Sequence, residues 1–219
     1  MRRSLRWALW LALAAAAPAA VAAAELPPAL QGFMSGLATY TAEFEQQVQD
    51  ARGETVARGR GTLWVQRPGR FRWDYRPANA TGAAADGQLL LADGKSLWLY
   101  ERDLAQATVR EAASAESAAP MLLLSGDAAQ IDKAFSVAAA PDREGLRWIE
   151  VRPRASAADF VRAELAFRGT ALVRMLIGDK LGQVTTLRIA RSQRNPRLDP
   201  ALFQFTPPPG VDVIGAAQP

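Results

Sequence analysis

The residue types that most often carry out catalysis are missing from this sequence. None of the 219 residues is a histidine or a cysteine, which removes the commonest general base, the usual zinc ligands and the thiol nucleophile. Zinc sites, disulfides and serine-histidine-aspartate triads are therefore excluded. The aspartates and glutamates form no paired-carboxylate motif, and there is no nucleophile elbow or glycine-rich phosphate loop. We expect no enzyme, no metal and no cofactor, with an exported hydrolase as the disfavoured alternative.

The most distinctive binding chemistry lies in the segment from Gly61 to Tyr75. This segment predicts two strands joined at Pro68-Gly69, because proline fixes φ and glycine accepts the positive φ of a type II turn. Side chains alternate across a strand, so the second strand has an aromatic face and a charged face. The aromatic face consists of Phe71, Trp73 and Tyr75. Such a face needs a cover, which is either protein core or a ligand.

Residues 1–24 have the pattern of a cleaved secretory signal peptide. Three arginines precede an apolar, alanine-rich stretch from Trp7 to Val21, and Ala22-Ala23-Ala24 fits the small-residue cleavage rule. We expect a mature chain that begins at Glu25 and is soluble in a bacterial periplasm. The alternative is an uncleaved membrane anchor, for which the apolar stretch is short. Without cysteine the chain is not itself lipidated.

Charge gives no indication of nucleic-acid binding once the signal peptide is removed. The whole chain has 26 basic and 22 acidic residues. The signal peptide has three arginines and no acidic residue, so the mature chain has 23 basic and 22 acidic residues, a net charge of +1. The arginine-glycine segment Arg58-Gly59-Arg60-Gly61 is more typical of a strand than of an RNA-binding tract. Residues 25–219 are long enough for one domain with a sizeable core.

Outside the hairpin, the pattern predicts a mainly β chain. Apolar residues at helical spacing indicate one amphipathic helix between Leu26 and Leu37, and Tyr40 to Val48 alternates as a strand. Further strands are expected at 55–60, 88–92, 96–100, 108–110, 135–139, 146–152, 160–167, 172–177, 184–190 and 211–214, with a helical turn at 201–205. About ten to eleven consecutive strands with one buried face imply a strongly curved antiparallel sheet or a barrel.

The segment from Glu111 to Asp132 interrupts this β pattern. Alanines, serines and glycines surround a run of four large apolar residues, Met121, Leu122, Leu123 and Leu124. We expect short helices here. The run either docks permanently as core or forms a lid whose apolar face covers a cavity.

The ordered set of motifs resembles the LolA-like family, the periplasmic outer-membrane lipoprotein carrier proteins. The matching segments are Phe44-Glu45-Gln46, the hairpin from Gly61 to Trp73, Asp93 to Tyr100, Asp199 to Phe203, and Phe205 to Asp212. They cover essentially the whole mature chain. One departure is the segment Pro77 to Gln88, which is longer than expected for the family and predicts a rim loop near the hairpin.

The resemblance implies an unclosed antiparallel half-barrel with an N-terminal helix and a helical lid over an apolar cavity. It also implies that the arginine of the Arg-Pro pair, Arg67 here, hydrogen-bonds to the lid and acts as a latch, and that Phe71 matters for transfer. From the residues alone, a solvated turn arginine is the favoured interpretation of Arg67, and the resemblance reverses that preference. The expected lid residues are Met121 to Leu124. The expected cavity residues are Phe44, Leu63, Val65, Phe71, Trp73, Leu89, Leu91, Trp98, Leu165 and Met175, with the inward parity of the strands left open.

The resemblance also implies cargo and partners. The cavity would take the acyl chains of lipoproteins released by an inner-membrane ABC transporter and deliver them to an outer-membrane acceptor lipoprotein. The carrier is expected to be a monomer that binds no nucleic acid. Two alternatives use the same half-barrel: a periplasmic sensor or regulator that binds lipid or lipoprotein without transporting it, and a carrier of glycolipid.

Overall fold

The computed structural model describes residues 26–79, 87–112, 123–156, 158 and 160–216. The signal peptide with its cleavage site, the predicted lid residues Met121 and Leu122, and most of the predicted rim loop lie outside these residues. No helix in the described ranges is long and apolar enough to cross a membrane.

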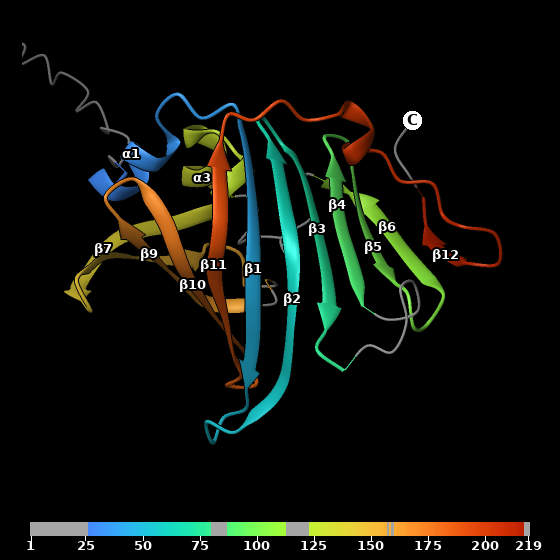
Figure 1. Ribbon diagram of the computed structural model, residues 1–219, viewed down its shortest axis with the longest axis horizontal. Helices are drawn as coiled ribbons and strands as arrows, with labels where there is room; N and C mark the ends of the chain where they lie inside the picture. Colours follow the sequence, from blue (N-terminus) through green and yellow to red (C-terminus); the bar gives the residue numbers. More distant parts are fainter. Residues whose placement is uncertain (1–25, 80–86, 113–122, 157, 159, 217–219) are drawn as a thin grey trace, which may run out of the picture.

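Twelve strands form one open sheet (Figure 1). The strands are β1 (Thr39–Gln49), β2 (Thr55–Gln66), β3 (Arg70–Pro77), β4 (Gln88–Asp93), β5 (Ser96–Glu101), β6 (Gln106–Glu111), β7 (Phe135–Arg143), β8 (Leu146–Pro153), β9 (Phe160–Arg168), β10 (Ala171–Asp179), β11 (Val184–Arg194) and β12 (Asp212–Gly215). Their order across the sheet is β12-β6-β5-β4-β3-β2-β1-β11-β10-β9-β8-β7.

The sheet consists of two antiparallel meanders joined in the middle. Strands β1 to β6 form one meander and β7 to β11 the other, and the β1–β11 pair connects them with Tyr40 opposite Arg194. β12 adds to the outer edge by pairing in parallel with β6. The prediction of a mainly β, unclosed sheet is confirmed. The sheet has twelve strands rather than ten to eleven. An edge strand was expected at 211–214, but its parallel pairing was not.

The helices gather on one face of the sheet, which we call the inner face. α1 (Pro28–Met34) and α3 (Ala128–Ala134) lie together near the same end of the sheet in Figure 1. The main hydrophobic core lies between them and the sheet. It includes Leu30 and Phe33 of α1, Ile131 of α3, and Leu123 and Leu124 of the short helical segment before α3.

Local sequence signals explain where these helices begin and end. α3 begins with a capping box, because the Asp127 carboxylate accepts the backbone N–H of Gln130 at 2.8 Å and the Gln130 side chain accepts the N–H of Asp127 at 3.0 Å. α1 begins with Pro28 in its first turn, where the missing N–H costs nothing. It ends before Gly36, whose φ of 63° leaves the helical region. α1 is therefore shorter than the predicted range of 26–37.

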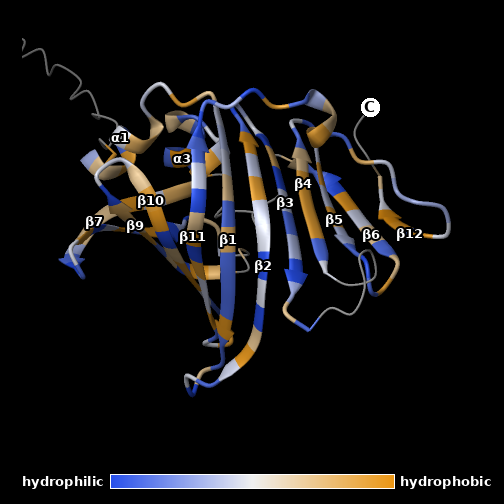
Figure 2. Ribbon diagram, in the orientation of Figure 1, coloured by the Kyte–Doolittle hydropathy of each residue, from blue (hydrophilic) through white to orange (hydrophobic). Residues whose placement is uncertain are grey.

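The opposite face, the outer face, is covered only in part. In Figure 2 the middle of β2 is white to blue and orange appears in its last third, where buried and partly buried residues alternate. A second apolar cluster, the outer cluster, lies on β4 to β6 and is covered by Phe205 and Val211 of the C-terminal segment. The short helix η3 (Pro200–Phe203) precedes this segment, and Asp199 caps it by accepting the N–H of Ala201 at 2.9 Å.

Candidate functional site

The register of β2 against β3 fixes which side chains of the aromatic hairpin share a face. Leu63 lies opposite Trp73 and Val65 opposite Phe71, and all four belong to the main core or pack against it. The ring of Phe44 lies against Trp73 with 4.1 Å between centroids. Phe71 and Trp73 therefore point to the inner face, which answers the question of parity that the sequence left open.

Gly61 is the position that lets Phe44 reach across to β3. It lies directly opposite Phe44 in β1. A Cβ at Gly61 would come within 2.4 Å of the Phe44 ring and 2.2 Å of the Asp74 carbonyl oxygen. Any side chain here would displace Phe44 from Trp73 or separate β2 from β3.

The other half of the sheet supplies further apolar residues to the same face. Met175 of β10 lies opposite Leu165 of β9 and Leu187 of β11, and all three are buried. Seven of the ten predicted cavity residues thus share the inner face: Phe44, Leu63, Val65, Phe71, Trp73, Leu165 and Met175. Their contact with a ligand stays a prediction.

Leu89, Leu91 and Trp98 lie on the outer face. This corrects the prediction that they line one cavity together with the seven residues of the inner face. Leu91 is paired with Trp98 in β5 and with Arg72 in β3, and Arg72 belongs to the charged face of the hairpin. Phe205 packs edge-on against Trp98 with 5.4 Å between ring centroids. The protein's own C-terminal segment therefore covers these three residues.

Leu90, Ala92 and Leu97 occupy the inner positions instead. Leu90 lies opposite Trp73, and Ala92 lies opposite Phe71 on one side and Leu97 on the other. Both faces of β4 are covered, so its sequence is a continuous apolar run with no alternation from which parity can be predicted.

The helical cover over the inner face includes half of the predicted lid. Leu123 and Leu124 are 0% and 1% exposed and pack in the main core. The carbonyl oxygen of Ser125 accepts the backbone N–H of Gly69 at 2.9 Å, so the cover is also bound to the β2–β3 turn. We call residues 123–134 the cover segment. Its apolar side chains occupy the inner face in this structure.

Arg67 connects the β2–β3 turn to both helical parts of the inner face. Its Nη2 donates to the carbonyl oxygen of Gly126 at 2.7 Å, and its Nη1 donates to that of Met34 at 3.3 Å. Burial lowers the pKa of the Arg67 guanidinium, and the Asp127 carboxylate acts in the opposite direction. Arg67 is charged at neutral pH and forms charge-assisted hydrogen bonds with α1 and with the cover segment.

A second arginine, which the sequence analysis did not single out, holds only α1. Arg194 donates to the carbonyl oxygens of Phe33 at 2.5 Å and Ser35 at 2.9 Å. The neighbouring Asn195 donates to the carbonyl of Gly36 and accepts the N–H of Ala38, both at 2.8 Å. The bond to Phe33 satisfies one of the carbonyl groups that the end of α1 leaves unpaired, and the others hold the chain that follows the helix. No local pattern distinguishes Arg194 from the surface arginines near it, because its partners are 159 and 161 positions away in the chain.

Tyr40 contributes a buried hydroxyl to the same core. It is 1% exposed, and its hydroxyl forms no well-aligned hydrogen bond within the described ranges. Burial raises the pKa of Tyr40 above the ordinary 10.0, while Ser192 and the charge of Arg194 lower it by less. The neutral phenol is therefore the form that the folded state favours.

Tyr40→Phe is expected to increase the free energy of unfolding by about 1 kcal/mol, because a buried unpaired hydroxyl costs about 1–3 kcal/mol. The raised pKa makes the wild type lose stability as the pH rises above 10.0, where the unfolded phenol ionises before the folded one. The variant lacks this contribution, so its stability should fall less over the same range. Urea unfolding at neutral and alkaline pH checks both effects. A destabilised variant with an unchanged alkaline profile would contradict them.

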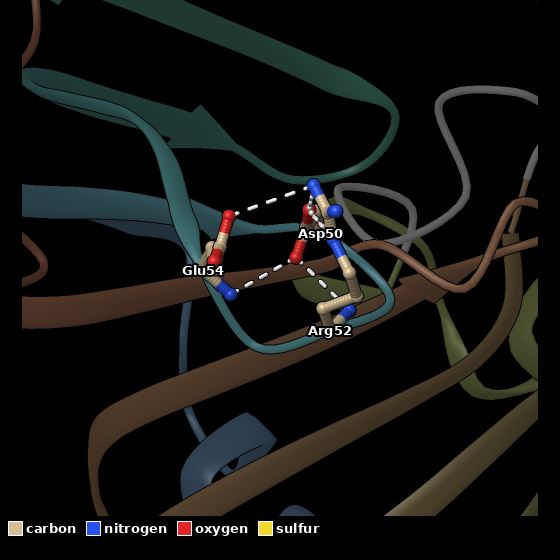
Figure 3. A network of polar contacts seen from close by, with 3 residues as sticks. All are labelled: Asp50, Arg52 and Glu54. Carbon is tan, nitrogen blue, oxygen red and sulfur yellow. Dashed lines mark hydrogen bonds and ion pairs between the residues drawn. The ribbon is translucent and has the colours of Figure 1, made fainter.

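The β1–β2 turn at the far end of the sheet is a self-contained polar network (Figure 3). The Asp50 carboxylate accepts the backbone N–H groups of Glu54 and Arg52, each at 2.9 Å, and these bonds, led by that from Glu54, lower the pKa of Asp50. The Arg52 guanidinium lies 3.2 Å from Asp50 and 3.5 Å from Glu54. The network stabilises the turn, so we assign it to folding.

The inner face is apolar, and the described residues bring no reactive side chains together on it. Its sheet side is aliphatic and aromatic, and polar contacts are confined to the ends of the helices. The part of the chain that the structure describes contains no group of acidic residues able to hold a metal ion.

Comparison with known proteins identifies the family. Residues 35–206 match the family described as outer membrane lipoprotein carrier protein LolA. The chain belongs to the LolA family. The match covers most of the chain, from the end of α1 to the segment that covers the outer cluster.

Curated relatives support the assignment over nearly the full length. Three carry the name outer-membrane lipoprotein carrier protein. The one from Dechloromonas aromatica is 36% identical over 85% of this chain and 86% of its own length. The one from Bordetella avium is 36% identical over 93% of this chain and 94% of its own length. The one from Xanthomonas axonopodis pv. citri is 38% identical over 100% of both chains. The resemblance inferred from the motifs is confirmed.

Solved structures resemble the chain more distantly. An uncharacterised conserved protein from Thermus thermophilus aligns with a TM-score of 0.47 at 13% identity, over 85% of this chain and 94% of that one. A LolA superfamily protein from Nitrosomonas europaea aligns with a TM-score of 0.45 at 9% identity, over 81% of this chain and 94% of that one. Membership of the LolA family therefore rests on the sequence relatives.

Proposed function

We propose that this chain is a periplasmic carrier that binds the acyl chains of lipoproteins on the inner face of its sheet. The observation that carries the proposal is the cover segment, in which Leu123 and Leu124 occupy the apolar face while a few hydrogen bonds hold the segment in place. An acyl chain would replace these leucines against Phe71, Trp73 and their neighbours. Membership of the LolA family and the names of the curated relatives support lipoprotein as the cargo.

The energetics of lipid transfer explain why such a carrier is needed. Each buried methylene contributes about 0.8 kcal/mol, so exposing one long acyl chain to water costs roughly 10 kcal/mol. An aliphatic and aromatic wall gives non-directional binding that tolerates different chains. A carrier must also release its cargo, and a cover that competes for the same wall limits the affinity. Arg67 acts in this proposal as the latch that favours the covered state.

The remaining steps follow from the same proposal. Residues 1–24 are removed as a signal peptide, and residues 25–219 act in the periplasm as a monomeric, non-enzymatic domain. An inner-membrane ABC transporter supplies the lipoprotein, and an outer-membrane acceptor lipoprotein receives it. The carrier itself uses no nucleotide, metal or cofactor.

Depletion of this protein in its bacterial host, followed by separation of inner and outer membranes, tests the proposal. Lipoproteins destined for the outer membrane should accumulate in the inner membrane. Correct sorting after depletion would count against the carrier function. Mass spectrometry of lipid that co-purifies with the periplasmic protein separates lipoprotein from glycolipid as cargo, and transfer from inner-membrane vesicles to an acceptor separates a carrier from a sensor.

A further inference from the structure

The outer face carries an unexplained concentration of positive charge. Arg58, Arg60, Arg76 and Arg188 line an open hollow of about 650 Å³ that extends over β1, β2, β3 and β11. We call these four residues the arginine patch. Among the described lining residues, Glu45 is the acidic one, so arginines outnumber acidic residues by four to one. The mature chain as a whole has a net charge of only +1, which makes this excess local.

The register of the sheet places like charges directly opposite one another. Arg60 faces Arg76 across β2 and β3, and Arg188 faces Arg174 across β11 and β10. Glu45 lies between Arg60 and Arg188 in the same row. Like charges in directly opposed positions destabilise a sheet. Glu45, directly opposite Arg60 and Arg188, offsets part of this cost, so the feature that binding would explain is the excess of arginines over acidic residues in the hollow.

Internal ion pairs do not neutralise most of the patch. Arg174, at the side of the row, is paired with Glu144 at 2.8 Å. Ion pairs also bind Glu43 to Arg191 and Asp74 to Arg102. Among the described residues, no carboxylate oxygen lies within 4.0 Å of a guanidinium nitrogen of three of the four patch arginines, at positions 58, 60 and 188. These three guanidinium groups are exposed and available to an external anion.

The chemistry of the hollow fits phosphate better than an acidic protein segment. Guanidinium groups bind phosphate in a bidentate manner, and Gln47 and Thr186 add neutral polar groups to the lining. Protein interfaces usually need large apolar or aromatic anchors at their centre. Pro77 and Ala78 are the apolar side chains that the hollow offers, and neither forms such an anchor.

Apolar side chains beside the patch favour a membrane surface as the source of the phosphate. Val56 precedes Arg58 by two positions and is 58% exposed, and Leu181 in the β10–β11 turn is 77% exposed. The β1–β2 and β10–β11 turns lie side by side, because Gly182 lies against Ala51. Basic residues next to protruding apolar side chains are typical of surfaces that bind anionic bilayers.

We propose that the arginine patch binds the phosphate groups of anionic lipid headgroups and holds the outer face against a membrane. The patch and the helical cover lie on opposite faces of the sheet, so docking leaves the cover segment free to open. This site is independent of the acyl-binding proposal, because vesicle binding is measured on the protein without cargo.

Co-sedimentation of the mature protein with vesicles of phosphatidylcholine, with and without phosphatidylglycerol, tests the patch. Binding to the anionic vesicles should exceed binding to neutral ones and should decrease with salt. The double variant Arg60→Gln/Arg188→Gln should bind anionic vesicles about 25-fold more weakly, since each arginine near an anionic surface contributes about fivefold. Its melting temperature should stay close to that of the wild type, because the loss of the like-charge pairs with Arg76 and Arg174 offsets the loss of the pairs with Glu45.

A double variant with the same loss of charge serves as the control. Arg147 and Arg168 are exposed on β8 and β9, away from the hollow, and Arg147→Gln/Arg168→Gln should bind vesicles like the wild type. Equal loss in both double variants would overturn the proposal, as would wild-type binding that does not distinguish anionic from neutral vesicles. Equal affinity for soluble glycerol phosphate would assign the site to a soluble phosphate, and preference for polyglutamate over vesicles would assign it to an acidic protein. Either result contradicts a membrane site.

Discussion

Arg67→Leu is expected to bind acyl chains more tightly than the wild type and to release them more slowly. The substitution removes the hydrogen bonds from Arg67 to Gly126 and Met34, at 2.7 and 3.3 Å. Hydrogen bonds from a charged donor contribute about 1.5–3 kcal/mol, and partial exposure reduces this, so the covered state loses about 2 kcal/mol. If acyl chains bind only when the cover segment is displaced, their apparent affinity increases with the uncovered fraction, by up to about 30-fold.

Binding of a fluorescent acyl chain measures the affinity, and its transfer to acceptor vesicles measures the rate of release. Two other arginines provide matched controls. Arg70 is exposed on the same turn, and Arg70→Leu should behave like the wild type. Arg194 binds α1 but not the cover segment, so Arg194→Leu should lower stability without the gain in affinity. Unchanged binding and release in Arg67→Leu would show that Arg67 is not a latch. The same gain in Arg194→Leu would assign the effect to α1.

Phe71→Ala is expected to lower the free energy of unfolding by about 3–5 kcal/mol, because it removes a large side chain from a packed core. Phe71 is 1% exposed and lies opposite Val65 and Ala92. If acyl chains bind on this face, their methylenes should fill part of the space left by the phenyl ring. A long-chain fatty acid should therefore raise the melting temperature of the variant by more than it raises that of the wild type.

Trp98→Ala is the control for this ligand-dependent recovery. Trp98 is 9% exposed in the outer cluster against Phe205, and its loss should cost a similar amount of stability. Because its cavity opens on the outer face, the fatty acid should stabilise Trp98→Ala no more than the wild type. Equal recovery in the two variants, or none in Phe71→Ala, would contradict the assignment of acyl binding to the inner face.

Strict alternation made the central hairpin predictable from its sequence. Aromatic and charged residues alternate between Phe71 and Asp74, so each residue could be assigned to one of two faces before the structure was known. The sequence did not show which of the two faces points to the inner side of the sheet. That depends on the pairing of β1 with β11, which brings together residues more than 130 positions apart.

The alternation of polar and apolar residues could not assign faces to the segment from Leu89 to Leu91. The C-terminal segment covers Leu89 and Leu91 on the outer face of β4, and the main core covers Leu90 on its inner face, so the run of three leucines serves two separate cores. Periodicity carries no information in a strand that is buried on both sides. The role of Arg194 was missed for another reason. Its hydrogen-bond partners are carbonyl groups of Phe33 and Ser35, which are distant in the sequence. Arg67 was found through the Arg-Pro motif, and its partners became visible only in the structure.

Site-specific photo-crosslinking to a bound lipoprotein tests the central claim most directly. Trp73 and Trp64 lie on neighbouring strands of the hairpin, and both are partly buried, but they point to opposite faces of the sheet. With p-benzoylphenylalanine at one position or the other, the inner-face account predicts a crosslink to the acylated cargo from position 73 and none from position 64. Crosslinking from position 64 alone, or equally from both, would contradict acyl binding beneath the cover segment.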